Sequence, residues 1–296
     1  QGKYADAEPL YERSQTIREM ALGFEHPDVA QSLHYRAGFL FQQGRRSEAE
    51  PLHKRSQAIR EKALGPQHPD VAHSLRNRAV WLACEGRYDE AEALSEQSQA
   101  IREKALGTSH PDVADSLYVR ALSMCNQDRH AEAEPLFQRS QILHEKALGS
   151  EHLDVSNVLD DRALSMYQQG RYDEAELFYN RSYAIREKVL GPDHLDVAQS
   201  LRNRAISTCK QQDRYTEAEP LYRRVQAMRE TILGPEHIDV AHVIVDRALS
   251  LHQQGDYMRA EPLYMRATQM TENALGPEHY EVATVLKGRA DMYVAQ

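Results

Sequence analysis

The feature that most constrains this chain is an internal repeat that runs from one end to the other. The pattern Gly-x-x-His occurs seven times in the 296 residues, and successive histidines are 42 residues apart except for one step of 43. Such a period indicates repeated supersecondary units that stack to bury a shared core, because one short unit cannot bury its apolar face alone. The histidines are His26, His68, His110, His152, His194, His237 and His279.

Each repeat contains two predicted helices. Apolar residues recur at helical spacing over residues 29–40, which predicts a first helix, helix A. Gly44 is suited to the left-handed conformation that ends such a helix. Ser47 with Glu50 three residues later is a capping-box pattern, which predicts that a second helix, helix B, begins there. The repeat is therefore a helical hairpin.

These hairpins resemble a known family. The strings GRYDEAEALSEQSQAIREKALG and GPDHLDVAQSLRNRA resemble the tetratricopeptide repeat in its 42-residue form, as in kinesin light chains. The chain is also similar to the repeat arrays attached to nucleotide-binding, immune-type receptors. The resemblance implies an all-α, right-handed solenoid of antiparallel helical hairpins, the tetratricopeptide superhelix. It implies little about the ligand, because one fold hosts many partners.

We expect residues 1–296 to form a single solenoid of about seven repeats. The chain begins inside a repeat, at the start of a helix B, and ends after a lone helix A from about Glu281 to Ala295. Solenoids normally need polar capping repeats at their ends. We therefore expect a fragment of a longer array, with end-to-end self-association through the uncovered terminal helices.

Composition excludes several classes of function. A formal net charge of −9 and a pI near 5.9 argue against binding to nucleic acid or to anionic membranes. No apolar run approaches the roughly 20 residues that span a bilayer, and no signal peptide opens the chain. The three cysteines do not form an even disulfide framework. The sequence predicts a cytoplasmic protein.

No enzyme site is predicted. The repeated histidines would stand roughly 10 Å apart, one helix-packing distance, whereas zinc needs several ligands at about 2 Å. We expect each imidazole to hydrogen-bond backbone in its own loop. The sequence contains no Gly-x-Gly-x-x-Gly, phosphate-binding loop or Gly-x-Ser-x-Gly pattern. We therefore predict no catalytic residue, no cofactor and no metal.

An arginine precedes the constant alanine of every helix A, where the tetratricopeptide family usually has an apolar residue. Two glutamate series, beginning at Glu8 and Glu19, recur as regularly in helix B. A buried guanidinium needs a partner, so we expect these arginines to pair with helix B, first with the Glu8 series and second with the Glu19 series. The alternative is a row of arginines facing an anionic ligand. The arginines are Arg36, Arg78, Arg120, Arg162, Arg204, Arg247 and Arg289.

Differences between the repeats concentrate in helix A. Four variable series begin at Gln31, His34, Gly38 and Phe41, and their offsets of 3, 4 and 3 residues place them on one stripe of the helix. In tetratricopeptide folds helix A lines the concave face, so the resemblance implies that this stripe is the ligand groove. Neutral drift at exposed positions is the alternative explanation.

We predict a non-catalytic scaffold that binds a protein or peptide partner in this groove. The alternative is a regulatory domain that senses a ligand and controls a nucleotide-binding switch. The predicted partner-binding residues are His34, His73, Arg76, Asp115, Tyr118, Leu122, Asn157, Asp160, Asp161, Leu164, Gln199, Arg202, Ile206, His242 and Lys287.

The composition of this groove predicts the chemistry of its ligand. Asp115, Asp160 and Asp161 favour an extended ligand segment with a central lysine or arginine. Acidic residues of the ligand on either side of that cation would meet arginines of the stripe. Leu122, Leu164 and Ile206 supply an apolar strip for an anchor side chain. The charges would set register and specificity, and the anchor would supply most of the binding energy.

Overall fold

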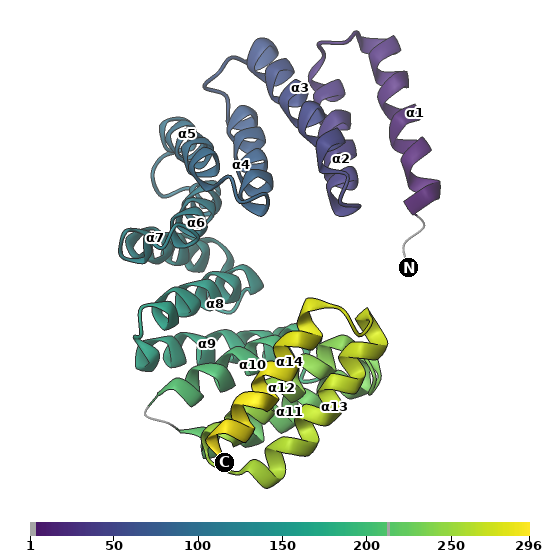
Figure 1. Ribbon diagram of the computed structural model, residues 1–296. Coiled ribbons are helices and arrows are strands. Elements are labelled where there is room, and N and C mark those ends of the chain that lie inside the picture. Colours follow the sequence, from purple (N-terminus) through teal and green to yellow (C-terminus); the bar gives the residue numbers. More distant parts are fainter. Residues whose placement is uncertain (1–3, 212–213) are drawn as a thin grey trace. The chain divides into compact units, whose positions relative to one another are not determined.

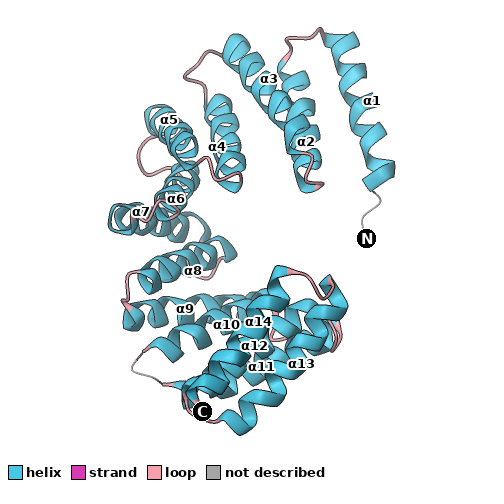
Figure 2. Cartoon of the chain, in the orientation of Figure 1, coloured by secondary structure: helices cyan, strands magenta, loops and turns pink. Residues whose placement is uncertain are grey.

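The computed structural model describes residues 4–211 and 214–296, and throughout that part the chain is helical hairpins with no strand (Figures 1 and 2). It divides into two compact units, Gln1–Ala147 and Leu148–Gln296, called here the first and second units. The all-α solenoid class predicted from the repeat is confirmed. A single continuous superhelix over residues 1–296 stays a prediction.

Helices B and A alternate along both units (Figure 1). The helices of the first unit are α1 (Tyr4–Leu22), α2 (Pro27–Gln42), α3 (Arg46–Leu64), α4 (Pro69–Cys84), α5 (Tyr88–Leu106), α6 (Pro111–Cys125) and α7 (His130–Leu148). Those of the second unit are α8 (Leu153–Gln168), α9 (Tyr172–Leu190), α10 (Leu195–Lys210), α11 (Tyr215–Leu233), α12 (Ile238–Gln253), α13 (Tyr257–Leu275) and α14 (Tyr280–Ala295). Even numbers are helices A and odd numbers are helices B.

The repeated histidine is the N-cap of every helix A. Nδ1 of His26 accepts a hydrogen bond from the backbone N–H of Asp28 at 3.2 Å, and the other six histidines make the same bond. Each imidazole thus satisfies one of the backbone donors that a helix leaves unpaired at its start. The local role predicted for these histidines is confirmed.

The predicted capping box at helix B is wrong. Helix α3 begins at Arg46, so Ser47 lies inside it, and its N-cap Arg45 makes no side-chain cap. Glu50 accepts from Arg87 of the next repeat at 3.2 Å and binds Lys54 at 2.8 Å. The guanidinium of Arg45 instead bonds Glu48 at 2.7 Å, holding the turn to the helix.

Small side chains allow the two helices of a hairpin to pack closely. Ala37 of helix A and Ala49 of helix B are both completely buried and share one core cluster. The hydroxyl of Ser56 donates to the backbone carbonyl of Ala30 at 2.7 Å, and Ser98 donates to Ala72 in the same way at 2.8 Å. The constant alanines, with a serine that Val225 and Ala267 replace in the last two repeats, therefore form the hairpin contact.

The helix-A arginines join consecutive hairpins through glutamine. Arg36 donates to Oε1 of Gln15 on the preceding helix B at 3.1 Å. Gln15 donates to Glu19 at 3.0 Å, and Glu19 also binds Arg55 of the following helix B at 2.8 Å. Arg36 also forms an ion pair with Glu12 of the preceding helix B at 2.5 Å, and Glu12 belongs to neither predicted series. Glu8, of the first predicted series, is bound by Arg45 of the turn at 2.6 Å.

The predicted direct pair does form in the last repeats. Arg247 donates to Glu219 at 2.7 Å, and Arg289 meets Glu261 at 3.5 Å. Asp256 occupies the turn position that holds an arginine in earlier repeats, so no turn arginine competes for Glu219. Glu219 also binds Arg223 and Arg259, each at 2.9 Å, so Arg247 is one of three arginines on this carboxylate.

Replacing a cap histidine tests the role of the Gly-x-x-His pattern. We expect His110→Ala to destabilise the protein by about 1 kcal/mol, because α6 then loses its side-chain N-cap. His110→Ser, a preferred N-cap residue, should retain most of that stability. Urea unfolding followed by circular dichroism measures both variants. Equal losses in the two variants would contradict the capping role.

Apolar side chains are exposed on the first and last helices. On α1, Ile17 and Met20 are more than half exposed, and on α14 Val294 is 89% exposed. We expect concentration-dependent self-association in light scattering, because these faces resemble those that stack inside the array. Ile17→Lys combined with Met20→Lys should weaken it, whereas Leu177→Lys on α9 should not. A strict monomer at all concentrations would refute the prediction.

Candidate functional site

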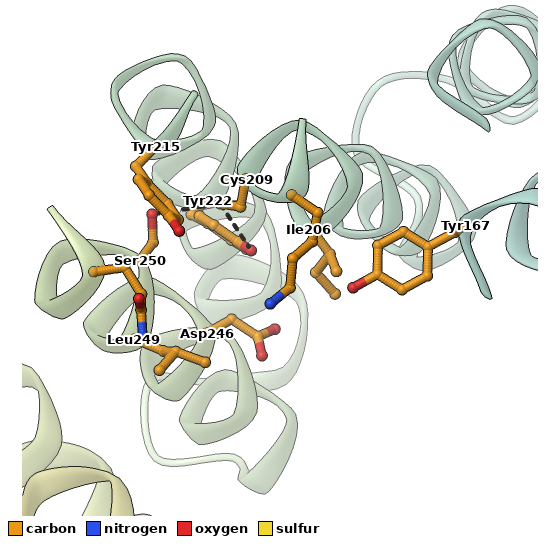
Figure 3. A pocket seen from close by; sticks show the side chains of 10 residues that line it. Tyr167, Ile206, Cys209, Tyr215, Tyr222, Asp246, Leu249 and Ser250 are labelled. Carbon is orange, nitrogen blue, oxygen red and sulfur yellow. Dashed lines mark hydrogen bonds between the residues drawn. The ribbon is translucent and has the colours of Figure 1, made fainter. Parts of the chain in front are cut away.

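Two adjoining hollows open on the helix-A face of the second unit. The first is a cavity of about 180 Å³ in which Tyr167 lies across from Tyr215 and Tyr222 (Figure 3). Its lining residues are Tyr167 on α8, Ile206, Cys209 and Lys210 on α10, Tyr215 and Tyr222 on α11, and Asp246, Leu249, Ser250 and Gln253 on α12.

Apart from Lys210 and Asp246, the first hollow is lined by uncharged side chains. The thiol of Cys209 lies 3.8 Å from the Tyr222 hydroxyl and 3.5 Å from Oγ of Ser250. Burial raises the pKa of Cys209 and that of Tyr222, so both groups are neutral at pH 7. A neutral floor of tyrosine rings with Ile206 beside it suits an apolar side chain.

An ion pair stands between the two hollows. Nε of Arg202 donates to Oδ2 of Asp246 at 2.5 Å, and Asp246 lines both cavities. Burial raises the pKa of Asp246 while Arg202 opposes that rise. The second hollow, of about 200 Å³, contains His242, whose Nε2 lies 2.9 Å from Glu281. The predicted residues Arg202, Ile206 and His242 are thus brought together here.

Four other predicted residues are bound by basic side chains of helix B. Nη1 of Arg186 donates to Asp160 and Nη2 donates to Asn157 at 2.8 Å. Arg229 donates to Gln199 at 2.7 Å. Asp115 lies 3.3 Å from Nε2 of His144. These polar groups of the helix-A stripe therefore have partners within the chain, and Asp160 is buried.

The remaining predicted residues of this stripe differ in exposure. Leu164 and Lys287 are exposed. Leu122 and Asp161 are half-buried. Tyr118 is also half-buried, and its ring centroid lies 6.2 Å from that of Phe137 on α7. These residues lie outside the two hollows.

In the first unit three histidines form a contiguous cluster. The ring of His34 lies 5.8 Å, centroid to centroid, from both His53 and His73. Burial, followed by neighbouring basic groups, lowers the pKa of His34 and of His53 to about 4. The pKa of His73 is lowered for the same reasons, with Arg102, Arg60 and Arg76 as the cations. All three imidazoles are therefore neutral at pH 7.

Tyr215 and Tyr222 were missed by the sequence prediction because it placed the groove on helix A alone. The side chain at one helix-B position varies widely in size between repeats, and this variation could have indicated the role of Tyr222. The residues at this position are Tyr11, His53, Ser95, Phe137, Tyr179, Tyr222 and Tyr264. Tyr167 and Leu249 belong to the variable helix-A series that begin at Phe41 and Gly38, and Asp246 directly follows Val245 of the His34 series. None of the three was selected as a binding residue.

Two other kinds of site can be assessed from the placed residues. Within residues 4–211 and 214–296, no three histidine, cysteine or carboxylate side chains are placed to hold a metal ion. In that same part of the chain, no helix has the length and apolar character needed to cross a bilayer. The histidine cluster is therefore a set of neighbouring neutral rings.

The family follows from the match of its sequence model. The tetratricopeptide repeat model matches residues 28–104, 75–124, 112–188, 178–231 and 239–296, and a second model of the same repeat matches residues 1–28. The chain belongs to the tetratricopeptide repeat family. Members of this family generally act as protein–protein interaction scaffolds and are typically not enzymes. No curated protein matches the chain in sequence.

Solved structures share the fold. The nearly identical TPR-like repeats assigned to a kinesin light chain of Podosopora anserina are 24% identical, with a TM-score of 0.63, and the match covers 70% of this chain and 97% of that one. BtubC (BKLC) from P. vanneervenii is 18% identical, with a TM-score of 0.66 over 78% and 91% of the two chains. A Rap protein complexed with competence and sporulation factor is 15% identical, with a TM-score of 0.56 over 90% and 75%. At these identities the likeness shows the fold alone.

The histidine cluster predicts a pH dependence of stability. Below pH 6.5 the unfolded chain binds protons that folded His53 does not accept until about pH 4, so stability should fall between pH 6.5 and 4. His53 alone should contribute a loss of about 3 kcal/mol over this range. Urea unfolding at pH 7 and pH 4.5 measures it. In His53→Phe the loss should be smaller, and an unchanged loss would refute this assignment.

Proposed function

We propose that this tetratricopeptide array binds an extended segment of a partner protein along the helix-A face of its second unit. The two adjoining hollows that share Asp246 are the observation that supports this most directly. Adjacent pockets on successive repeats suit an extended chain, which presents its side chains at regular intervals. The proposed binding mode is peptide capture in a groove.

Variation between the repeats also supports binding of the partner at the helix-A face. The hollows are lined by Arg202, Ile206, His242 and Leu249, and each belongs to a helix-A series whose members differ from repeat to repeat. The hairpin contact, by contrast, keeps its alanines in all repeats. Surface residues that differ from repeat to repeat, on a scaffold that stays constant, are the pattern expected of a recognition surface.

An apolar anchor should supply most of the binding energy. Asp160 is bound by Arg186 and Asp246 by Arg202, so a cation of the partner must compete with an internal one for either carboxylate. The hollow between α10, α11 and α12 has a neutral floor. Apolar side chains that fill such a pocket are typical hot spots of an interface.

Blocking the first hollow tests the proposal. Peptides selected on this protein from a random displayed library provide the probe, and fluorescence anisotropy gives their affinity. Leu249→Arg, at a 45% exposed position on the rim, should weaken binding at least about 30-fold, because an anchor contact contributes about 2 kcal/mol or more. The free energy of unfolding should change little.

A matched substitution on another face controls for added charge. Leu177 on helix B of the same unit is 69% exposed and lies outside both hollows, so Leu177→Arg should leave peptide affinity unchanged. If Leu177→Arg abolishes binding while Leu249→Arg has no effect, the partner binds a different face and the proposal is wrong.

A further inference from the structure

The helical walls of the second-unit groove restrict the backbone of any segment that binds there. In the part of the chain that the structure describes there is no strand, so no sheet edge can pair with the backbone of a partner. The N–H and C=O groups inside the helices are bonded within each helix. A segment along this face must therefore satisfy its backbone groups with water and with side chains of the groove.

Polyproline II is the extended conformation that meets this condition. It has no internal hydrogen bonds, and its backbone is fully solvated. A bound β-strand, by contrast, gains its affinity from main-chain hydrogen bonds to a sheet edge. Proline fixes the backbone near the polyproline II conformation and removes the N–H donor. A proline-rich segment therefore loses less conformational freedom on binding and leaves fewer backbone donors unpaired.

The separation of the two hollows matches the repeat of this conformation. The α12 residues that line the first hollow are centred about five positions after those that line the second, which is about 8 Å along the helix axis. A sideways offset adds to this distance, because the first hollow reaches α8 and the second reaches α14. In polyproline II every third side chain lies on the same side, about 9 Å apart, whereas alternate side chains of a β-strand are only about 7 Å apart.

Tyrosine rings dominate the lining of the first hollow. Tyr167 lies across from Tyr215 and Tyr222 (Figure 3). The ring of Tyr167 also packs against that of Tyr172, with a centroid distance of 5.3 Å and an interplanar angle of 60°. The faces of aromatic rings carry partial negative charge, which complements the partly positive ring hydrogens beside a proline nitrogen. Polyproline II segments are bound in aromatic-lined grooves of this kind.

The polar groups of the first hollow complement a backbone that has acceptors but few donors. Lys210 and Gln253 line this hollow and are exposed, so both can donate hydrogen bonds to the carbonyl oxygens of a bound segment. The carboxylate of Asp246 is bound by Arg202. The hollow therefore offers ring faces and hydrogen-bond donors, which are the two groups that a proline-rich segment needs.

The second hollow continues the groove with smaller apolar side chains. Val245 and Val285 belong to its lining, together with Tyr280, which is 71% exposed. Its volume of about 200 Å³ is close to the 180 Å³ of the first hollow. Each hollow therefore has room for one aliphatic side chain of the same segment.

We propose that the second unit binds a proline-rich segment in the polyproline II conformation, with two apolar side chains three positions apart that enter the two hollows. This inference rests on the proposed groove function, and it names the conformation and composition of the partner segment. An amphipathic helix and a β-strand are the competing conformations, and prolines within the segment disfavour both.

Three fluorescein-labelled peptides test the proposal on the full chain. PPLPPLPP favours polyproline II and places its leucines three positions apart. GGLGGLGG keeps the leucines in place on a flexible backbone, and PPLPLPPP keeps the prolines but turns the leucines to different sides. By fluorescence anisotropy we expect saturable binding of PPLPPLPP, at least about 10-fold tighter than that of the other two, because it is preorganised and reaches both hollows. Equal affinity for either control peptide, or no saturable binding of PPLPPLPP, overturns the proposal.

Substitutions at Tyr167 separate recognition by a ring face from general apolar contact. Tyr167→Leu keeps an apolar side chain but removes the ring, so it should weaken PPLPPLPP binding about 5-fold. Tyr167→Phe keeps the ring and should retain the affinity. Circular dichroism checks that both variants are folded. Equal affinities of the two variants would contradict the ring-face contact.

Two surface variants locate the bound peptide and do not depend on the folding of the Tyr167 variants. Leu249→Arg on the rim of the first hollow should weaken PPLPPLPP binding, and Leu177→Arg outside both hollows should not. Binding of PPLPPLPP that ignores Leu249→Arg overturns this inference. If library-selected peptides respond to Leu249→Arg while PPLPPLPP does not bind, the groove function stands and the polyproline II assignment alone fails. If the library-selected peptides also ignore Leu249→Arg, the groove function itself is wrong.

Discussion

The close approach of helix A to helix B within each hairpin is the contact on which the rest of the structure depends. Completely buried alanines such as Ala37 and Ala49 let the two backbones come near enough for the hydroxyl of Ser56 to reach a main-chain carbonyl. A larger side chain at either alanine would separate the helices and overpack the core. Because neighbouring hairpins stack on this contact, its geometry is repeated along each unit.

A constant hairpin contact frees other positions to differ. Helix A uses Val29, Leu33 and Leu40 for the core, and its remaining residues meet either the next hairpin or the groove. The second-unit hollows form where the variable helix-A residues Ile206 and Leu249 lie beside Tyr222 of helix B. The scaffold thus fixes where a pocket can form, and the individual repeat fixes its size and polarity.

Local spacing in the sequence was enough to predict the hairpins, because helical periodicity and the cap His26 act within one turn. Contacts between consecutive repeats were not predictable in the same way. Ser47 matched a capping box, yet Glu50 is bound by Arg87 of the following repeat. Tyr222 was missed because its role in a hollow depends on α10 and α12, which surround it only in the folded unit.

The helix-B arginines take different partners in different repeats, although they stand at one position of the scaffold. Where helix A offers an aspartate, as Asp160 does for Arg186, the charge is satisfied internally and contributes to folding alone. Where it offers His34 before Arg60, the guanidinium donates to neutral acceptors, Oγ of Ser74 and Oε1 of Gln31. The side chain at this helix-A position therefore decides whether the helix-B arginine is held by a charged or by a neutral acceptor.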